Sequence, residues 1–590
     1  MPRLAIVLGV VALALAFATE AGAQRTQLLP SVFYQQDVQF TPHGPVAIHV
    51  VQGPRPTGLY RLRPALSNES VTGLERVTSI EKRMSAQASA VVGINGDYYS
   101  FRDGRPSGIL MRDRVLVSAP EPGRSSAGIT LDGLLDVRKT KLSSSWQGVG
   151  PRRPVAAFNE APGPNDVALF TSDWGSATPP IPGALAVVLS PFPAASPGVD
   201  LVAPVADALR ADSVGIAPGT AVLVARGNAA TRLESEAPLG AALTIRLYLQ
   251  SGWDAVLDAI GGGPALVRDG RPVFDANEAF TRSQLVPRHP RTAVGQTADG
   301  RVLLVAVDGR QVGYSVGMTN FEMAQTMMRL GADRAMALDG GGSTTLAFDG
   351  AVLNKPSEGR ERPVSTALML LYSGIYARLP STAVVSPNGD GVDEKQKLSY
   401  KLVRPSEVTV TLTAPDGSVA FQDAGARQPG TYEVAFPPAQ VSPPGVPPTP
   451  PPEPLPIPEG RWSLTVSATD DQGSASTSTR EFWVNTTLGF LRVVPKSVRL
   501  RPPGAEVRIQ WAQAHPARVT VRVETMQGVV LKRVAQRVFA RGPHVLVWNG
   551  RRRDGKLAYG GRYRILVSAR NAFDSVSLEQ TIVVRRVRPK

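Results

Sequence analysis

The chain has 590 residues and a formal net charge of +15, with 43% hydrophobic and 19% charged residues. This composition is that of a folded protein, and the length predicts three or four domains rather than one core. Cysteine is absent and histidine occurs five times. The sequence therefore excludes a thiol nucleophile and cysteine-bound zinc or iron–sulfur centres.

The first residues have the pattern of a secretory signal peptide. Arg3 precedes an apolar stretch from Leu4 to Phe17, and Ala21-Gly22-Ala23 is a small-x-small cleavage site. We therefore predict a signal peptide over residues 1–23 and an exported chain, periplasmic or secreted, with no membrane span after cleavage. An uncleaved membrane anchor is the alternative.

Residues 24–380 alternate apolar strands, helical patterns and turns rich in Gly and Pro. This alternation predicts an α/β (mixed α+β) catalytic domain. Three of its apolar strands lead directly into polar, glycine-rich turns, at residues 95–99, 308–310 and 339–345. Polar groups at the carboxyl ends of neighbouring strands converge on one crevice, so we expect the active site there.

A helix is predicted between the last two of these strands. Residues 319–322 form a capping box, and an apolar stripe at helical spacing consists of Phe321, Ala324, Met328 and Leu330. A strand, a helix and a strand in this order predict a right-handed crossover, with Asp308 and Asp339 at the same edge of a parallel pair.

Paired carboxylates are what glycosidic cleavage usually needs, one to protonate the leaving group and one to act as base or nucleophile. Asp308 and Asp339 are the two candidates, and either could be the acid. The glycines after Asp339 allow close backbone approach, and their N–H groups can cradle an anion. A divalent cation such as Ca²⁺ or Mg²⁺ near the two carboxylates is compatible with this site, although the spacing does not demand one.

A phosphate-binding residue is predicted upstream of these strands. Arg291 carries a fork of donors suited to a phosphate. His289 is interpreted as a loop residue, with a catalytic acid as the alternative. The segment IGGGP at residues 260–264 is interpreted as a structural turn, with a second phosphate-facing turn as the alternative.

Four segments together resemble the phosphodiester glycosidase family: GINGDYY at 93–99, IGGGP at 260–264, HPRTAVG at 289–295 and LDGGGSTT at 338–345. The resemblance covers roughly residues 70–373. It implies hydrolysis on the glycosidic side of a sugar phosphodiester, such as an N-acetylglucosamine-1-phosphodiester. The catalytic residues that it implies are Asp339, Asp308 and Asn95. The substrate- and phosphate-binding residues that it implies are Arg291, Thr292, Gly340, Gly341, Gly342, Ser343, Thr344 and Asp97.

The chain also departs from the animal members of that family. It lacks every cysteine, and its tail has no disulfide-rich module. We therefore expect a phosphorylated or anionic glycan of the cell envelope or the extracellular space as the substrate.

The tail has the pattern of two all-β Ig-like sandwich modules, at residues 381–486 and 487–590. Short alternating strands are separated by turn residues, and GRWSLTVSA at 460–468 matches GRYRILVSA at 561–569. The offset is about the length of one Ig-like sandwich. A Pro-rich stretch at residues 441–459 is expected to form an extended loop in the first module.

Short motifs in the tail resemble Ig-like repeats related to flagellar-hook-capping proteins. They are SPNGDG at 386–391 in the first module, and WNG at 548–550 and GGRY at 560–563 in the second. The tail is also similar to C-terminal modules of secreted bacterial proteins.

The positive charge belongs to the last module alone. Residues 487–590 contain 22 Lys and Arg against 5 Asp and Glu, whereas the rest of the chain contains 42 against 44. For an exported protein this favours an anionic envelope polymer as the partner, and not nucleic acid. A solvated basic surface is the alternative.

The leading functional hypothesis is therefore an exported phosphodiester glycosidase. A cell-surface polysaccharide-binding or scaffold protein with an inactive glycosidase-like domain is the second hypothesis. A hydrolase of unphosphorylated exopolysaccharide is the third, and such an enzyme would not need Arg291.

Overall fold

The computed structural model describes residues 25–250, 252–253, 255–273, 278–438, 457–501 and 504–586. The chain divides into two compact units, one with residues 1–84 and 91–371 and the other with residues 85–90 and 372–590. The predicted signal peptide lies outside the described residues, as does most of the Pro-rich stretch. No helix in the described ranges has the length and hydrophobicity of a membrane span.

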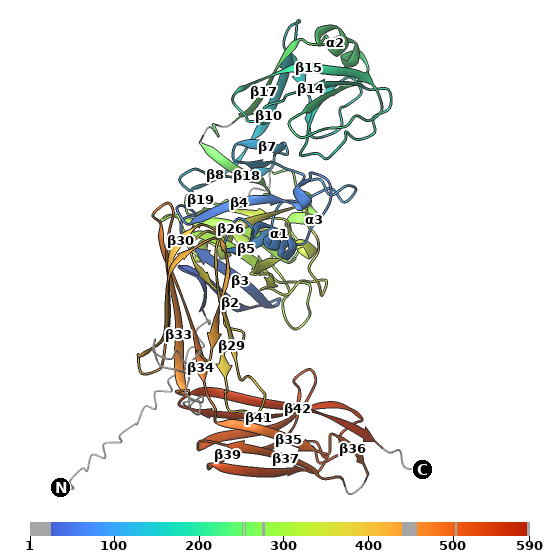
Figure 1. Ribbon diagram of the computed structural model, residues 1–590. Coiled ribbons are helices and arrows are strands. Elements are labelled where there is room, and N and C mark those ends of the chain that lie inside the picture. Colours follow the sequence, from blue (N-terminus) through green and yellow to red (C-terminus); the bar gives the residue numbers. More distant parts are fainter. Residues whose placement is uncertain are drawn as a thin grey trace, which may run out of the picture. The chain divides into compact units, whose positions relative to one another are not determined.

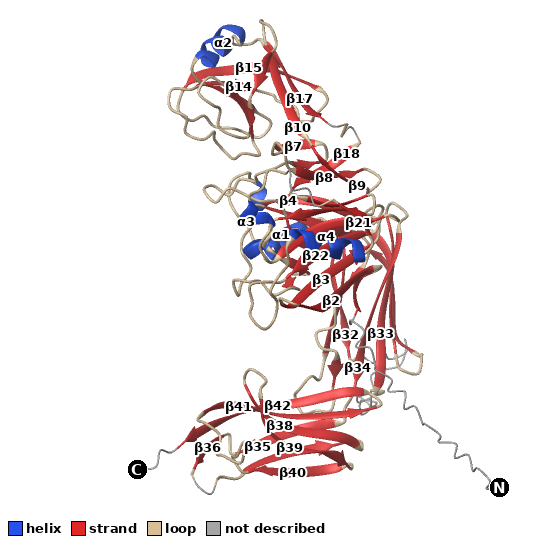
Figure 2. Cartoon of the chain, turned by 180° about the vertical axis from the view of Figure 1, so that it is seen from behind, coloured by secondary structure: helices blue, strands red, loops and turns tan. Residues whose placement is uncertain are grey.

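Strands dominate the molecule, as the red arrows of Figure 2 show, and the described helices are short. These helices are α1 (Val77–Met84), α2 (Asn228–Glu236), α3 (Arg282–Leu285) and α4 (Asn320–Arg329), with the 3-10 turns η1 (Ser67–Glu69) and η2 (Gly341–Ser343). The prediction of an α/β (mixed α+β) catalytic domain is therefore wrong, because the first unit is a β-rich structure.

The physical reason is that buried strands hide their direction in the sequence. A strand covered on both faces is a continuous apolar run in a parallel and in an antiparallel sheet alike, and Val302–Val307 is such a run. In the first unit most neighbouring strands pair antiparallel. The single strand–helix–strand segment that contains residues 302–338 therefore does not predict the fold class of the whole domain.

One eight-stranded sheet is here called the main sheet, and Figure 1 labels its strands β2, β3 and β19. Its strands are, in spatial order, β1 (Arg25–Leu29), β2 (Val32–Thr41), β3 (Gly44–Gly53), β22 (Val302–Val307), β21 (Arg291–Thr297), β23 (Ala332–Leu338), β19 (Ala265–Arg268) and β20 (Arg271–Pro272). Helix α4 packs on this sheet through Met323, Ala324 and Met327.

The predicted helix exists, and Thr319 caps it in the expected capping box. Its apolar stripe was partly misjudged, because Phe321 and Met328 are exposed. Strands β22 and β23 run parallel, but β21 lies between them and pairs antiparallel with both. Asp308 and Asp339 therefore follow strands at the same edge of the sheet, but these strands are not neighbours.

Three further sheets complete the first unit. A five-stranded sheet has the order β25 (Ala351–Val352), β24 (Leu346–Phe348), β5 (Ala90–Asn95), β26 (Thr366–Tyr372) and β4 (Tyr60–Leu66). Another has the order β7 (Val115–Ser118), β6 (Leu110–Arg112), β18 (Val256–Gly261), β8 (Ser125–Thr130) and β9 (Leu135–Lys139). The third, here called the insert sheet, has the order β11 (Arg153–Val155), β10 (Lys141–Gln147), β17 (Ala242–Gln250), β15 (Asp200–Arg210), β14 (Leu185–Leu189), β16 (Ala221–Ala225), β13 (Val167–Thr171) and β12 (Ala157–Phe158).

The second unit contains two all-β modules with the same arrangement of strands. In the first module a three-stranded sheet, β27 (Tyr376–Ala377), β29 (Gln396–Leu402) and β32 (Gly430–Phe436), accompanies the five strands β28 (Val384–Val385), β34 (Ala475–Val484), β33 (Gly460–Asp470), β30 (Ser406–Thr413) and β31 (Val419–Arg427). In the second module β35 (Leu488–Val494), β37 (Val507–Gln513) and β40 (Gly542–Trp548) accompany β36 (Ser497–Leu500), β42 (Asp574–Arg586), β41 (Gly561–Asn571), β38 (Ala517–Thr525) and β39 (Val530–Phe539).

The internal sequence match falls on equivalent strands. The two matching segments are the central strands β33 and β41 of the two five-stranded sheets. Trp462 and Tyr563 occupy the same position of the repeat, and each donates a hydrogen bond to the carbonyl four residues earlier in the chain. The repeat read from the sequence therefore reflects a repeated fold.

Candidate active site

A cavity of about 340 Å³ lies at the carboxyl end of β23 in the first unit. We call it the active-site cavity. Its lining comes from segments far apart in the sequence, and the residues that carry its chemistry are Tyr98, Tyr99, Phe101, Arg124, Phe280, His289, Arg291, Arg310 and Asp339. One carboxylate and several cations thus face a common space of the size of a small ligand pocket.

Asp339 follows β23 directly and is half-buried in the wall of the cavity. Burial is the largest influence on its carboxyl group and raises its pKa to about 6, with a further rise from the nearby Asp97. The Ser343 hydroxyl and the Gly340 N–H act in the opposite direction. Asp339 therefore changes its charge close to neutral pH, which is a property of many catalytic carboxylates.

The glycines after Asp339 leave room for close neighbours, which are the Pro290 carbonyl at Gly340 and arginine side chains at Gly341 and Gly342. Gly341 has a φ of +65°, and a Cβ there would lie 3.2 Å from the Arg310 guanidinium. A Cβ on Gly342 would overlap with Arg362. The N–H of Gly341 already donates to the Pro290 carbonyl at 2.9 Å. The turn thus leaves space for arginine side chains near Asp339. The N–H of Gly341 is already hydrogen-bonded and is not free to bind an anion.

Arg124 is the buried cation of the cavity with unused donors. Its guanidinium packs against the rings of both Tyr98 and Phe280, at 4.5 and 4.6 Å from their centroids, and the two rings contact each other. Its Nε and Nη2 have no hydrogen-bond partner. Nη2 is 3.6 Å from Asp97 Oδ1, which is an ion pair but too long for a hydrogen bond. Buried unused donors of this kind are what an anionic ligand could satisfy.

Arg291 also lines the cavity, but its guanidinium holds the surrounding loops. It donates to the carbonyls of Met318, Gln284 and Pro287 at 2.9, 2.9 and 2.8 Å. Burial lowers the pKa of Arg291 to about 10. The side chain is therefore a cation near the site with much of its hydrogen-bonding capacity committed to the backbone.

Arg310 and His289 form a neighbouring pair. Nε and Nη2 of Arg310 lie 3.3 and 3.2 Å from His289 Nδ1. Burial, followed by the charges of Arg310 and Arg291, lowers the pKa of His289. The imidazole is therefore neutral at pH 7 and can accept a hydrogen bond from Arg310 at Nδ1.

Asn95 and two threonines lie behind the cavity and hold the backbone of Asp339. Asn95 Nδ2 donates to the Asp339 carbonyl at 2.7 Å, and Asn95 Oδ1 accepts from Thr292 Oγ1 at 2.9 Å. The hydroxyls of Thr292 and Thr344 are 3.2 Å apart. All three side chains are fully buried and lie outside the cavity lining. The structure thus brings them to Asp339 as supports and leaves them out of reach of a substrate in the cavity.

Asp97 is buried beside Arg124. Its Oδ1 accepts from the Tyr98 N–H at 2.8 Å, and its Oδ2 has no hydrogen-bond partner. Burial is the largest influence and raises the pKa of Asp97 to about 6, although the charge of Arg124 opposes this rise. A Cβ on Gly261 would overlap with the Asp97 carboxyl, so close packing requires glycine at this position.

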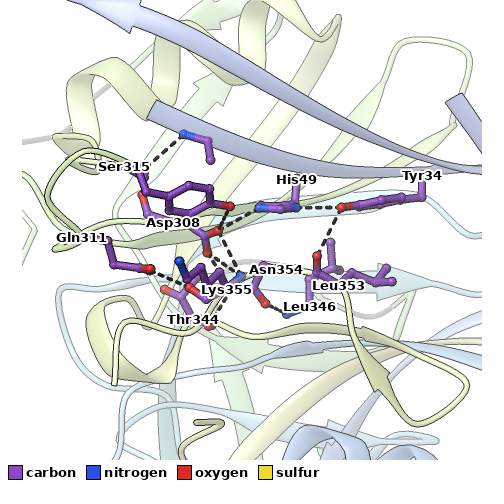
Figure 3. Close-up of polar contacts among 12 residues, drawn as sticks. Tyr34, His49, Asp308, Gln311, Ser315, Thr344, Leu346, Leu353, Asn354 and Lys355 are labelled. Carbon is purple, nitrogen blue, oxygen red and sulfur yellow. Dashed lines mark hydrogen bonds and ion pairs between the residues drawn. The ribbon is translucent and has the colours of Figure 1, made fainter. Parts of the chain in front are cut away.

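Asp308 belongs to a separate buried network, drawn in Figure 3. Its carboxylate accepts from His49 Nε2 at 2.9 Å and, each at 3.0 Å, from the Tyr314 hydroxyl, Asn354 Nδ2 and the Lys355 N–H. His49 Nδ1 in turn lies 2.8 Å from the Tyr34 hydroxyl. Asp308 is 1% exposed and is absent from the lining of the active-site cavity. The structure therefore does not bring Asp308 and Asp339 together around one substrate.

Several residues of the cavity had no sequence motif to identify them. Arg124, Phe280 and Phe101 come from three separate loops, and each is one of many similar residues in the chain. Tyr98 is part of the GINGDYY segment, and Arg310 follows Asp308 in the turn at residues 308–310. Both therefore lie in predicted site segments, although neither was predicted as a site residue.

In the described part of the chain, no cluster of three His, Asp or Glu side chains could hold a metal ion. The predicted divalent cation near Asp308 and Asp339 stays a prediction.

Part of the chain matches a known protein family. Residues 203–371 match the family model "Phosphodiester glycosidase". The resemblance inferred from the motifs is confirmed for this region, and a glycosidase-type hydrolase is supported. The GINGDYY segment lies outside the matched residues.

Individual relatives match only in part. An uncharacterized SPbeta prophage-derived protein of Bacillus subtilis is 37% identical over 107 residues, and the match spans 16% of that protein. A hypothetical protein from Synechocystis has a solved structure with a TM-score of 0.50 at 23% identity, covering 58% of this chain and 62% of that one. The catalytic domain of zebrafish N-acetylglucosamine-1-phosphodiester alpha-N-acetylglucosaminidase has a TM-score of 0.33 at 16% identity, covering 58% of this chain and 83% of that one.

Proposed function

We propose that this chain cleaves the sugar side of a sugar phosphodiester and releases a free sugar and a phosphomonoester. The observation that carries the proposal is the meeting of Asp339 with Arg124, Arg291 and Arg310 in one cavity. Among the described residues that line this cavity, Asp339 is the only acidic one. The match of residues 203–371 to phosphodiester glycosidases supports the same reaction class.

In this proposal the Asp339 carboxylate is a general base. It accepts a proton from a water molecule, whose oxygen attacks the anomeric carbon of the sugar. The bond between that carbon and the phosphate oxygen breaks, and its electron pair stays on the phosphate. Because the leaving group is a phosphate and not an alkoxide, its charge is stabilised by cations and needs no proton from a second carboxylic acid.

The phosphate is assigned to Arg124 and Arg310 rather than to Arg291. Arg124 has unused N–H groups in a buried position, and Arg310 lies over the Gly341 turn next to Asp339. Arg291 contributes its positive charge while its donors hold the loop carbonyls. Desolvated, preorganised cations of this kind interact strongly with an anion because the site excludes water.

The sugar ring is assigned to the aromatic side of the cavity. Phe101 is 85% exposed although it is a large apolar side chain, and its ring lies 5.3 Å from that of Tyr99. An exposed aromatic ring at the mouth of a binding site offers a flat apolar face to a ligand. The apolar face of a pyranose is a suitable occupant.

The direct test uses methyl-phosphodiesters of sugars, beginning with N-acetylglucosamine. The purified chain should release free sugar and methyl phosphate, with and without a chelator to test the divalent cation. Failure to cleave any such compound, together with cleavage of an unphosphorylated glycoside, would support the third hypothesis.

The pH dependence tests the role of Asp339. Its pKa is raised to about 6, so the base is ionised above this pH and protonated below it. We expect kcat/KM to be highest above pH 7 and to fall as the pH decreases through about 6. The substrate phosphodiester stays ionised in this range, so it does not contribute to the change.

Asp97 titrates in the same range, so two coupled groups can make the acid limb of the profile steep. The measurement is kcat/KM from pH 4.5 to 9 at constant ionic strength. A rate that increases as the pH falls through 6 would mean that Asp339 donates a proton, and the proposed role would then be wrong.

We further propose that the chain is exported and that the second module attaches it to an anionic polymer. On the outward face of the β38–β41 sheet, Arg518 lies directly opposite Arg570, and Arg522 lies opposite Arg533 on β39. Like charges in directly opposed cross-strand pairs destabilise a sheet. A bound polyanion removes this repulsion, so the face is suited to acidic polysaccharide.

This second proposal predicts salt-sensitive binding of the whole chain to a linear acidic polysaccharide such as polygalacturonate. An Arg518→Ser, Arg570→Ser double variant should weaken binding about tenfold at low salt. The matched control is Arg268→Ser, Arg271→Ser, because these arginines are also exposed cross-strand partners but lie in the first unit. If both double variants lost binding equally, net charge alone would explain the binding, and the proposed binding face on the second module would be contradicted.

A further inference from the structure

A second cavity, of about 350 Å³, lies in the first unit beside the insert sheet. We call it the insert cavity. Its polar lining includes Arg105, Ser107, Glu121, Lys141, Ser144 and Glu160. Its volume is within the range of small-molecule sites, and it nearly equals the volume of the active-site cavity. The reaction assigned to Asp339 makes no use of it.

Two loops connect the insert cavity to the active-site cavity. Ser107 lines both cavities. The loop at residues 98–107 presents Tyr98 and Phe101 to the active-site cavity and Arg105 to the insert cavity. Hydrogen bonds from the Ser100 N–H to the Arg105 carbonyl and from the Ser107 N–H to the Tyr98 carbonyl fix this loop.

The loop at residues 118–124 has the same double role. Glu121 lines the insert cavity, whereas Arg124, three residues later, lines the active-site cavity. The Arg124 N–H donates to the Glu121 carbonyl at 3.3 Å, which closes a turn between the two side chains. The insert cavity therefore begins next to Arg124, the residue to which the substrate phosphate is assigned.

The lining of the insert cavity has the chemistry of a carbohydrate site. Its lining includes the hydroxyl groups of Ser107 and Ser144 and the charged ends of Arg105 and Glu160, which form an ion pair at 2.7 Å. Lys141 is exposed and also lines this cavity. Such groups donate and accept hydrogen bonds with sugar hydroxyls, and Lys141 suits an acidic substituent.

We propose that the insert cavity binds the sugar chain on the far side of the scissile phosphate, so that the enzyme acts on an oligosaccharide or polymer phosphodiester. This inference rests on the proposed function of the active-site cavity. The phosphate at Arg124 is the boundary: the released sugar lies toward Phe101, and the retained chain continues past Glu121 into the insert cavity. Binding energy from the retained chain then raises catalytic efficiency on long substrates.

The test compares two substrates that share the released sugar. One is the methyl phosphodiester of N-acetylglucosamine, and the other carries a trisaccharide in place of the methyl group. In the unmodified chain we expect kcat/KM to be about tenfold higher for the trisaccharide substrate. A Ser144→Trp variant fills the insert cavity, and the ratio should fall to about one while turnover of the methyl substrate is unchanged.

Ser143→Trp is the matched control. Ser143 is the neighbouring residue on β10, exposed and outside the cavity lining, so the same substitution should leave the ratio as in the unmodified chain. A substrate ratio of one in the unmodified chain, or an equal loss on both substrates in Ser144→Trp, would contradict the insert cavity as a binding site. Absence of turnover on both substrates in the unmodified chain would instead contradict the proposed function itself.

Discussion

An Asp339→Asn variant should lose about 10²- to 10⁴-fold in kcat on a sugar phosphodiester, because the amide cannot accept the proton of the attacking water. KM should change little, since the arginines and aromatic rings that bind the substrate stay in place. Release of free sugar and of phosphomonoester gives the rate, and both products should decrease together. Full turnover in this variant would remove Asp339 from the mechanism.

The variant should also fold, because two backbone hydrogen bonds hold this residue in place. Asn95 Nδ2 donates to the Asp339 carbonyl, and the Asp339 N–H donates to the Gly96 carbonyl at 2.9 Å. Neither contact involves the carboxylate. Replacing a half-buried carboxylate of raised pKa by a neutral amide also removes a desolvation cost at pH 7.

Asp308→Asn is the matched control, with the same chemical change at the other predicted carboxylate. Four groups donate hydrogen bonds to the Asp308 carboxylate. In the variant an amide NH₂ replaces one carboxylate oxygen, and because NH₂ is itself a donor, it cannot accept the hydrogen bonds that this oxygen accepted. We expect a loss of about 1–3 kcal/mol in the free energy of unfolding, with kcat of the folded fraction retained. Thermal unfolding measured beside kinetics separates the two outcomes.

The sequence was most informative where structure depends on local pattern. Alternating apolar residues and turn residues were enough to predict all-β tail modules, and the match between residues 460–468 and 561–569 predicted equivalent strands. The capping box at Thr319 and Glu322 likewise depends on neighbours in the chain, and it was predicted correctly. In each case the residues that determine the structure lie within a few positions of one another.

The sequence was less informative where position depends on distant segments. The order β22, β21, β23 puts an antiparallel strand between the two strands that end at Asp308 and Asp339. Nothing in either strand reveals this neighbour. Two aspartates with the same local context, an apolar strand followed by glycine, therefore end in different surroundings, one in a saturated network and one in a cavity.

The assignment of the phosphate to Arg291 had the same weakness. Its motif marked the residue as important, and the structure gives it three backbone carbonyls to hold. Arg124 has no motif, and its place against Tyr98 and Phe280 arises from three separate loops. Spacing in the sequence can identify a constrained residue, but it does not distinguish a ligand-binding arginine from one that supports a loop.

An Arg124→Met variant should bind a sugar 1-phosphate about 10- to 100-fold more weakly than the unmodified chain, while affinity for the free sugar is unchanged. Methionine is shorter than arginine, but it replaces the apolar part of the side chain and packs well against Tyr98 and Phe280, so the loss is mainly one of charge and hydrogen bonds. Asp97 then loses its cation, so the pKa of its carboxyl rises further and the group binds a proton more readily, which reduces the cost of an unpaired buried charge. Titration calorimetry with both ligands measures the difference.

Arg291→Met is the comparison that decides between the two arginines. It leaves three carbonyls without donors, so we expect a lower unfolding temperature and a smaller change in phosphate affinity than in Arg124→Met. The reverse result, with phosphate binding lost in Arg291→Met and kept in Arg124→Met, would return the phosphate to Arg291. It would also move the boundary between the active-site and insert cavities, because that boundary depends on a phosphate held at Arg124.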